Sequence, residues 1–145
     1  MRKRWTLMYG MARARSAWND HMRQITQEEG VSDSYRPVIM FLYRNPGASQ
    51  KNIAEFLNVT TSAVNQVVKN MADEDYLRKE ADPADKRSIK LYLTDRGEET
   101  ASRLRQRLQQ SDDAITAFVG PEQEEELLKF LHELTDFIQK ELPLC

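Results

Sequence analysis

The sequence predicts a mainly α-helical fold that is interrupted once by a two-stranded β-sheet. Apolar residues recur every three or four positions along most of the chain, which is the spacing of one helix face. Between residues 77 and 93 this spacing changes to two, which is typical of a strand with one buried face. The chain has only five glycines and five prolines, and most lie where a helix is expected to begin or end. These observations together predict a series of helices with one hairpin.

Length, composition and charge restrict the class of protein. A chain of 145 residues, 40% hydrophobic and 30% charged, can bury a core, which excludes a disordered tail. Its longest apolar run is far shorter than the roughly 18 residues that span a bilayer, so we expect no membrane partner. The formal net charge of −2 argues against binding nucleic acid through bulk positive charge alone. A localised basic surface is still compatible with this total.

The cysteine and the amino-terminal segment predict a cytoplasmic protein. Cys145 is the single cysteine and cannot form an internal disulfide, which fits a reducing compartment. Polar residues interrupt segment 6–22, so it lacks the unbroken apolar stretch of a secretory signal. A redox role for Cys145 requires an exposed, activated thiol. An incidental thiol is the simpler interpretation.

Four helical segments are predicted before the hairpin. The first two are apolar stripes over residues 7–25 and 35–43. The next two are short, over residues 49–57 and from Thr60 to about Glu74, with Thr60 or a neighbouring hydroxyl as the N-cap. A brief polar hinge joins them, which predicts a helix-turn-helix. We expect the following side chains of this pair to face inward: Ile53, Ala54, Phe56 and Leu57, then Ala63, Val64, Val67, Val68 and Met71.

A β-hairpin with a charged tip follows the helix-turn-helix. Ile89, Leu91 and Leu93 alternate with polar residues, and segment 77–80 can pair with them across the tip at 82–87. Helical spacing resumes after Thr94 and continues, after a break at residues 120–121, to Pro143. A helix-turn-helix followed directly by a hairpin is a winged helix, whose second helix fits the DNA major groove while the wing reaches the flanking backbone or minor groove.

Four short motifs between residues 48 and 97 lie on these predicted elements. They are Ile53-Ala54-Glu55-Phe56-Leu57, Val64 with Val67-Val68, Asp82-Pro83-Ala84-Asp85-Lys86-Arg87, and Leu93-Thr94-Asp95-Arg96-Gly97. Together they resemble the MarR family of bacterial transcription regulators. In two places the chain departs from the family pattern: Ala84 stands where the wing usually has a second arginine, and Asp75 where a glycine usually ends the recognition helix. An aspartate tolerates a left-handed helix end better than most residues do.

The resemblance implies an obligate homodimer that places one winged helix in each half-site of pseudo-palindromic double-stranded DNA. The terminal apolar stripes agree, because they are too apolar to be left in water. We therefore expect an amino-terminal dimerisation helix at 1–31, a DNA-binding winged helix at 32–97 with its wing at 77–94, and linker and dimerisation helices at 98–145. The alternative is that the stripes pack only within their own chain.

Candidate DNA-binding residues occupy the second helix and the wing. Amide side chains can bond adenine edges, hydroxyls can bond bases or phosphates, and cations can neutralise phosphates. Arg87 is expected to enter the minor groove, with Asp85 accepting from its guanidinium, as in related proteins. The candidates are Thr61, Ser62, Asn65, Gln66 and Lys69 on the helix, and Arg78, Lys79, Asp85, Lys86, Arg87 and Lys90 on the wing. A solvated helix face and a solvated turn are the alternatives.

The resemblance also implies a repressor that a small aromatic or anionic effector releases from DNA. The effector would enter a cleft between the dimer helices and the DNA-binding part of the chain. Side chains that could line this cleft are Trp18, His21, Met22, Tyr35, Arg36, Met40 and Tyr43. The alternative is that they are core and interface residues.

We expect neither an enzyme nor a cofactor. His21 and His132 lie in different terminal helices, and the sequence has no glycine-rich phosphate loop, CxxC pair or HExxH metal motif. The competing function is a winged-helix module that binds another protein without sequence-specific DNA binding. The basic residues of the wing disfavour this alternative.

Overall fold

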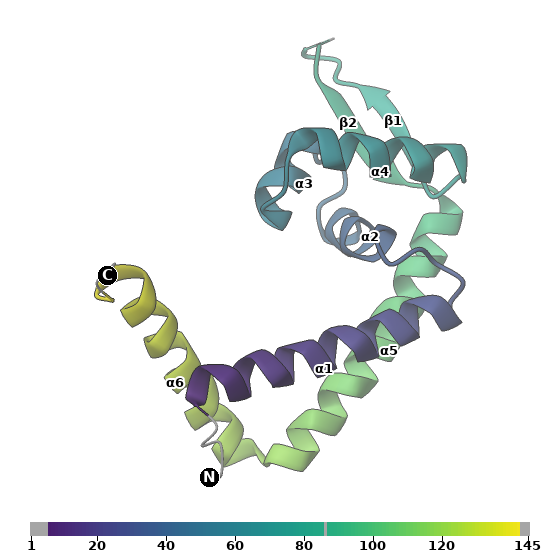
Figure 1. Cartoon of the computed structure of the whole chain (residues 1–145). Coiled ribbons are helices and arrows are strands. Elements are labelled where there is room, and N and C mark those ends of the chain that lie inside the picture. Colours follow the sequence, from purple (N-terminus) through teal and green to yellow (C-terminus); the bar gives the residue numbers. More distant parts are fainter. Residues whose placement is uncertain (1–5, 86, 143–145) are drawn as a thin grey trace. The chain divides into compact units, whose positions relative to one another are not determined.

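The computed structural model describes residues 6–85 and 87–142 (Figure 1). It contains α1 (Leu7–Glu28), α2 (Tyr35–Arg44), α3 (Gln50–Leu57), α4 (Thr61–Asp73), β1 (Leu77–Ala81), β2 (Ile89–Leu93), α5 (Asp95–Val119) and α6 (Pro121–Lys140). The predicted fold class, mainly helical with one two-stranded sheet, is confirmed. Lys86 and Cys145 lie outside the described residues. Within those residues, no helix is long and apolar enough to cross a membrane. The chain forms two compact units, residues 1–107 and 108–145.

The core of the first unit lies among α2, α3, α4, the hairpin and the start of α5. Its fully buried side chains include Ile39, Ile53, Val68, Leu91 and Leu104, each of which is 0% exposed. The carboxyl end of α1 joins this core through Met22, Ile25 and Thr26. Leu7, Met8 and Tyr9 at its amino end are each more than half exposed.

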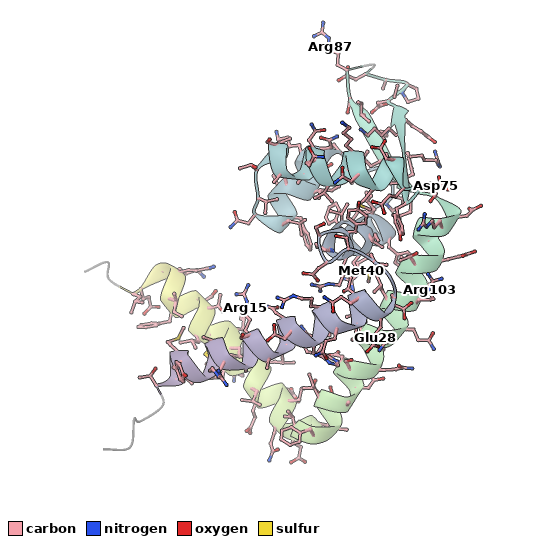
Figure 2. All side chains as sticks on the ribbon, turned by 45° about the vertical axis from the view of Figure 1, so that its right-hand side comes forward. Arg15, Glu28, Met40, Asp75, Arg87 and Arg103 are labelled. Atoms are coloured by element: carbon pink, nitrogen blue, oxygen red, sulfur yellow. The ribbon has the colours of Figure 1, made fainter. Side chains whose placement is uncertain are left out.

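Ion pairs attach the carboxyl end of α1 to α5 (Figure 2). Arg107 Nη2 lies 2.5 Å from Glu28 Oε2, and Arg103 Nε lies 3.1 Å from Glu29 Oε2. Acidic residues at a helix carboxyl end face the negative end of the helix dipole, so the two arginines offset an unfavourable local charge.

Local capping explains where the helix-turn-helix bends. Ser49 and Asn52 form a capping box at the start of α3, and Asn58 ends the helix in the left-handed region at φ 53°. Thr60 then caps α4, because its side chain accepts from the Ala63 amide at 3.2 Å. This confirms the N-cap predicted for Thr60.

The expectation that Phe56 and Ala63 face inward is wrong. Phe56 is 66% exposed, and its ring packs on Phe41 with a centroid distance of 4.8 Å. Each residue turns a helix by about 100°, so Phe56 lies about 110° from the centre of the face that Ile53 and Ala54 bury. Ala63 is displaced by about the same angle from the buried face of α4.

The wing is the predicted hairpin, and its strands pair antiparallel with Leu77 opposite Leu93. Leu77, Leu91 and Leu93 are buried on its inner face. An isolated bridge between Ala48 and Leu91 ties this face to the turn before α3. The base of the hairpin, where β1 begins and β2 ends, is therefore held on the helical core.

The turn from α4 into β1 uses Asp75 in the left-handed region, at φ 61°. The Tyr76 amide donates to Met71 O at 2.8 Å and the Asp75 amide to Ala72 O at 3.1 Å, the bond pattern of a Schellman cap. The departure from glycine at this position therefore preserves the turn.

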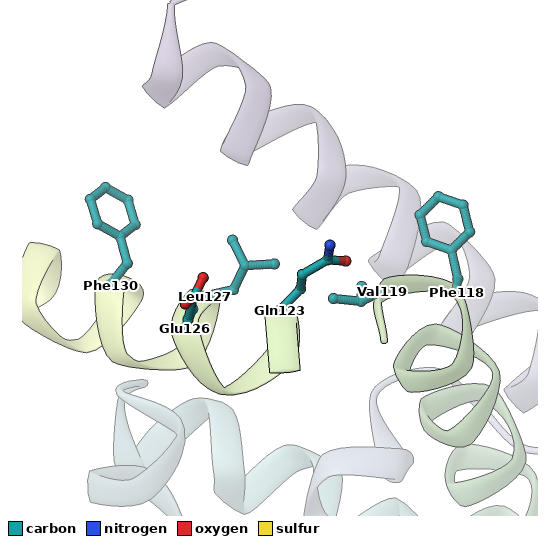
Figure 3. A pocket seen from close by; sticks show the side chains of 6 residues that line it. All are labelled: Phe118, Val119, Gln123, Glu126, Leu127 and Phe130. Carbon is teal, nitrogen blue, oxygen red and sulfur yellow. The ribbon is translucent and has the colours of Figure 1, made fainter. Parts of the chain in front are cut away.

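The second unit consists of the end of α5 and α6. Gly120, at φ 88°, separates the two helices, and Pro121 is the first residue of α6. None of the residues of α6 is buried, and Phe118 at the end of α5 is 91% exposed. Figure 3 shows Phe118, Leu127 and Phe130 around an open groove of about 630 Å³. An extended apolar surface is thus left uncovered by the described chain.

Candidate nucleic-acid interface

An open groove of about 770 Å³ lies between the amino ends of α3 and α4 and the tip of the wing. Five predicted DNA-binding residues line it together, although up to 26 positions separate them in the sequence: Thr61, Ser62, Asn65, Asp85 and Arg87. All five are exposed. The groove therefore joins neutral hydrogen-bonding side chains of α4 to a cation of the wing.

The remaining candidates on α4 lie further along its exposed face. Gln66 donates through Nε2 to Asn70 Oδ1 at 3.0 Å, which uses one of its two amide hydrogens and orients the other. Lys69 is exposed one turn after Asn65. α4 thus presents a polar outer face opposite the buried Val64, Val68 and Met71.

The wing tip is organised by backbone hydrogen bonds to carboxylates. Asp85 Oδ1 accepts from the backbone amide of Arg87 at 3.0 Å, and Asp82 Oδ1 accepts from the Ala84 amide at 2.9 Å. From the sequence we expect Asp85 to accept from the Arg87 guanidinium. In the structure it accepts from the Arg87 backbone amide, because an aspartate in a turn is well placed to bond the amide two residues later. Figure 2 shows the Arg87 side chain extending away from the hairpin tip.

The cations on the strands of the wing have partners within the hairpin. Arg78 pairs with Glu80 and lies over the Tyr92 ring, 4.8 Å from its centroid. Lys90 Nζ lies 3.3 Å from Asp82 Oδ2. The hydrogen bond from the Ala84 amide, together with Lys90, lowers the pKa of Asp82 below its usual value. Lys79 is exposed, and Lys86 lies outside the described residues.

Sequence reasoning missed the contribution of α3 and the second strand to the groove. Ser49, Gln50 and Lys51 at the start of α3 line it, as does Ile89 of β2. Lys51 is 80% exposed in its side chain and pairs only loosely with Glu55, at 3.9 Å. The capping motif at Ser49 signals a helix start, which favours anions through its free amides, so a phosphate contact could have been inferred there.

The predicted effector residues lie on α1 and α2 of the first unit. Trp18 and His21 contact each other with ring centroids 5.9 Å apart. The Arg105 guanidinium carbon lies over the Tyr43 ring, 6.0 Å from its centroid. Met22 and Tyr35 are 2% and 5% exposed, so neither presents surface to an effector in this conformation.

Arg36 and Met40 are half-buried members of the same predicted set. Arg36 Nη2 lies 3.5 Å from Asp33 Oδ1, and its buried Nε has no hydrogen-bond partner among the described residues. The effector role of the whole set stays a prediction.

The fold and the groove define a winged helix-turn-helix protein. A sequence model described as the MarR family matches residues 29–88, which confirms the resemblance to that family of transcriptional regulators. It is similar to a Thauera aromatica protein described as a transcriptional regulatory protein for the hcr operon, with 25% identity over 82% of this chain and 72% of the relative.

Solved structures of similar fold include two with bound molecules. One is the transcriptional repressor CouR bound to a 23-mer DNA duplex, with a TM-score of 0.77 and 23% identity over 90% of this chain and 92% of the other. Another is NadR in complex with 4-hydroxyphenylacetate, with a TM-score of 0.73 and 21% identity over 92% and 95% of the two chains. These likenesses bear out the winged-helix fold.

Proposed function

We propose that this protein is a homodimeric transcriptional regulator that binds double-stranded DNA sequence-specifically through α4 and the wing. The observation that carries the proposal is the groove in which Thr61, Ser62 and Asn65 face the same space as Arg87. Asn65 and Gln66 bond base edges in the major groove, while Thr61 and Ser62 bond phosphates at the first turn of α4. Arg87 enters the neighbouring minor groove.

Cations of α3, α4 and the wing supply affinity without sequence information. Lys69, Lys79 and Lys86 neutralise phosphates. Arg78 and Lys90 also contact phosphates while they stay paired with their carboxylate partners in the hairpin. Lys51 adds a phosphate contact at the start of α3. The basic groove also disfavours the alternative function, a module that binds another protein. The chain has no catalytic role in this proposal.

The dimer is formed by the terminal helices of two copies of this chain. Leu127, Phe130 and Leu131 are each at least 40% exposed on one side of α6, and Leu7 and Met8 are more than half exposed on α1. Apolar surface of this extent is covered in a stable protein. A two-fold axis between protomers matches a pseudo-palindromic DNA site.

Regulation by a small molecule follows from the same family relationship. The structurally similar CouR is a transcriptional repressor, and NadR binds 4-hydroxyphenylacetate, an aromatic carboxylate. This chain accordingly acts as a cytoplasmic repressor that an aromatic or anionic effector releases from DNA. The half-buried Arg36, with its unpartnered Nε, is the cation best suited to such an anion.

Selection of duplexes from a random pool tests DNA recognition. The selected duplex and a scrambled duplex of the same length are then titrated with the protein in rising salt. We expect the selected duplex to bind about a thousandfold more tightly than the scrambled one. The logarithm of its association constant should fall linearly with the logarithm of the salt concentration. Equal affinity for both duplexes at every salt concentration would remove sequence-specific binding and favour the protein-interaction module.

A further inference from the structure

The carboxyl end of α4 is held by three hydrogen bonds from outside the helix. The Tyr35 hydroxyl of α2 donates to Glu74 Oε1 at 2.6 Å. The Arg96 guanidinium of α5 donates to the backbone oxygen of Glu74 at 2.6 Å, and Thr94 Oγ1 donates to the backbone oxygen of Asp75 at 2.5 Å. Side chains from two other helices and the segment between β2 and α5 therefore converge on the two residues that directly follow the last turn of α4.

Tyr76 closes these contacts into one cluster. The Arg96 guanidinium lies 4.2 Å from the centroid of the Tyr76 ring and donates to its hydroxyl at 3.1 Å. The Tyr35 ring meets the Tyr76 ring edge-on, with centroids 5.7 Å apart. We call Tyr35, Glu74, Tyr76 and Arg96 the α4 anchor.

The bond from Tyr35 to Glu74 is a strong member of the α4 anchor. Tyr35 is 5% exposed, and its acceptor is a carboxylate, which makes the bond stronger than one between neutral groups. Burial of the ring, followed by the hydrogen bond to Glu74, raises the pKa of Tyr35 to about 12. The hydroxyl therefore keeps its proton, and the hydrogen bond, throughout the physiological pH range.

Small rotations at this end of α4 become large displacements at the other end. The 13 residues of α4 span roughly 20 Å, so a tilt of about 5° about the anchored end moves the amino end by about 1.7 Å. Base recognition depends on hydrogen bonds whose lengths vary by only about 0.5 Å. Asn65 and the other groove residues lie toward this moving end.

We propose that Tyr35 and Glu74 are positioning residues for DNA recognition: their hydrogen bond fixes the tilt of α4, and with it the alignment of Asn65 and Gln66 on the bases. The proposal rests on the DNA-binding function proposed above. It gives Tyr35 a role in DNA recognition in place of the predicted contact with an effector. Neither residue touches DNA, because Tyr35 is buried and Glu74 follows the last turn of α4.

Substitutions at the two ends of this bond test the proposal. Tyr35→Phe and Glu74→Ala each remove the bond, and we expect each to weaken binding to the selected duplex about tenfold. Glu74→Gln keeps an oxygen acceptor for the Tyr35 hydroxyl and is expected to bind within about twofold of the wild type. Asp73→Ala is the matched control, because it removes the same charge one residue earlier, where no hydrogen bond to Tyr35 exists.

The ratio of affinities for selected and scrambled duplexes separates positioning from a loss of folded protein. Partial unfolding lowers both affinities equally, whereas a tilted α4 loses base contacts and keeps most phosphate contacts. We expect the ratio to fall in Tyr35→Phe and Glu74→Ala and to stay unchanged in Glu74→Gln and Asp73→Ala. An unchanged ratio in the first two variants overturns the positioning role. Absence of any preference in the wild type instead overturns the DNA-binding function itself.

Discussion

At the scale of single residues, one glycine sets how closely α5 approaches the base of the wing. A β-carbon added at Gly97 would lie 2.1 Å from the backbone oxygen of Tyr76 and 3.1 Å from Leu93 Cβ. The Tyr76 oxygen already accepts the Thr94 amide at 3.1 Å, so it cannot move without breaking that bond. The glycine that ends the motif Leu93-Thr94-Asp95-Arg96-Gly97 is therefore required by a close backbone approach.

Replacing this glycine tests the close approach. Gly97→Ala is expected to lower the free energy of unfolding by about 1–3 kcal/mol, because the backbone must shift to admit the methyl group. Gly10→Ala serves as the control: apart from its chain neighbours and the backbone of its own helix, no described atom lies within 4 Å of the added carbon, and alanine is the better helix former by about 0.5–1 kcal/mol. Urea denaturation measures both. A Gly97→Ala protein as stable as the wild type would contradict the packing described here.

Arg87 is the residue whose loss should report on the wing alone. Arg87→Ala is expected to cost about 1–3 kcal/mol of affinity for the selected duplex, since the guanidinium extends away from the hairpin tip. Lys129→Ala, which removes one positive charge from α6, is expected to leave affinity nearly unchanged. Fluorescence anisotropy measures the affinities, and sedimentation verifies that both variants keep the oligomeric state of the wild type. Equal effects of the two substitutions would remove the wing from DNA binding.

At the scale of elements, the wing depends on carboxylates in its turn as well as on strand pairing. Asp82 accepts from the Ala84 amide and pairs with Lys90, and its own amide donates to Ser88 O at 2.9 Å. Because the pKa of Asp82 is lowered in the folded wing, the carboxylate form stabilises the turn. This contribution is present above the ordinary aspartate pKa and is lost as the pH falls through the lowered value.

Acid titration of the wing should therefore show a local transition. We expect the Ala84 amide resonance to shift, and its protection from exchange relative to an unfolded chain at the same pH to fall, below the ordinary aspartate pKa near 3.8. In Asp82→Asn this pH dependence should disappear, because the amide oxygen still accepts from Ala84 but does not titrate. Two-dimensional NMR follows the resonance. Persistence of the transition in Asp82→Asn would assign it to another group.

At the scale of the whole molecule, apolar and charged surfaces are segregated along the chain. Residues 1–23 carry a formal charge of +5 (six basic, one acidic), and residues 121–142 carry −5 (two basic, seven acidic). The same carboxyl-terminal helix exposes Leu127, Phe130 and Leu131. The proposed dimer covers this apolar side, and the acidic remainder limits non-specific attraction to DNA.

A charge placed on the apolar side of α6 should separate the protomers. Leu127→Glu is expected to weaken dimerisation about a hundredfold or more, because a carboxylate without a partner would be buried at the interface. His132→Glu adds the same group about 140° away from Leu127 around the helix and should leave the dimer intact. Sedimentation equilibrium measures the association. A fully dimeric Leu127→Glu protein would place the interface elsewhere.

The helices, the hairpin and their boundaries were predictable because their causes are local. The apolar period of each segment, the Thr60 cap and the left-handed Asp75 involve residues within one or two helical turns of each other. The orientation of Phe56 was not predictable in the same way, since the apolar run in α3 is wider than the face that the core can cover. Periodicity shows that a residue is apolar, and packing decides whether it is buried.

The amino-acid sequence by itself determined the fold class, the family resemblance and most side chains of the proposed DNA-binding surface. Only the tertiary structure decided which of them share a groove, that Lys51 and Ile89 join them, and that Tyr35 contacts Glu74 across 39 positions. The physical reason is one of range. Secondary structure follows from neighbours along the chain, whereas a groove or an anchor is made by residues that meet only after the helices have packed.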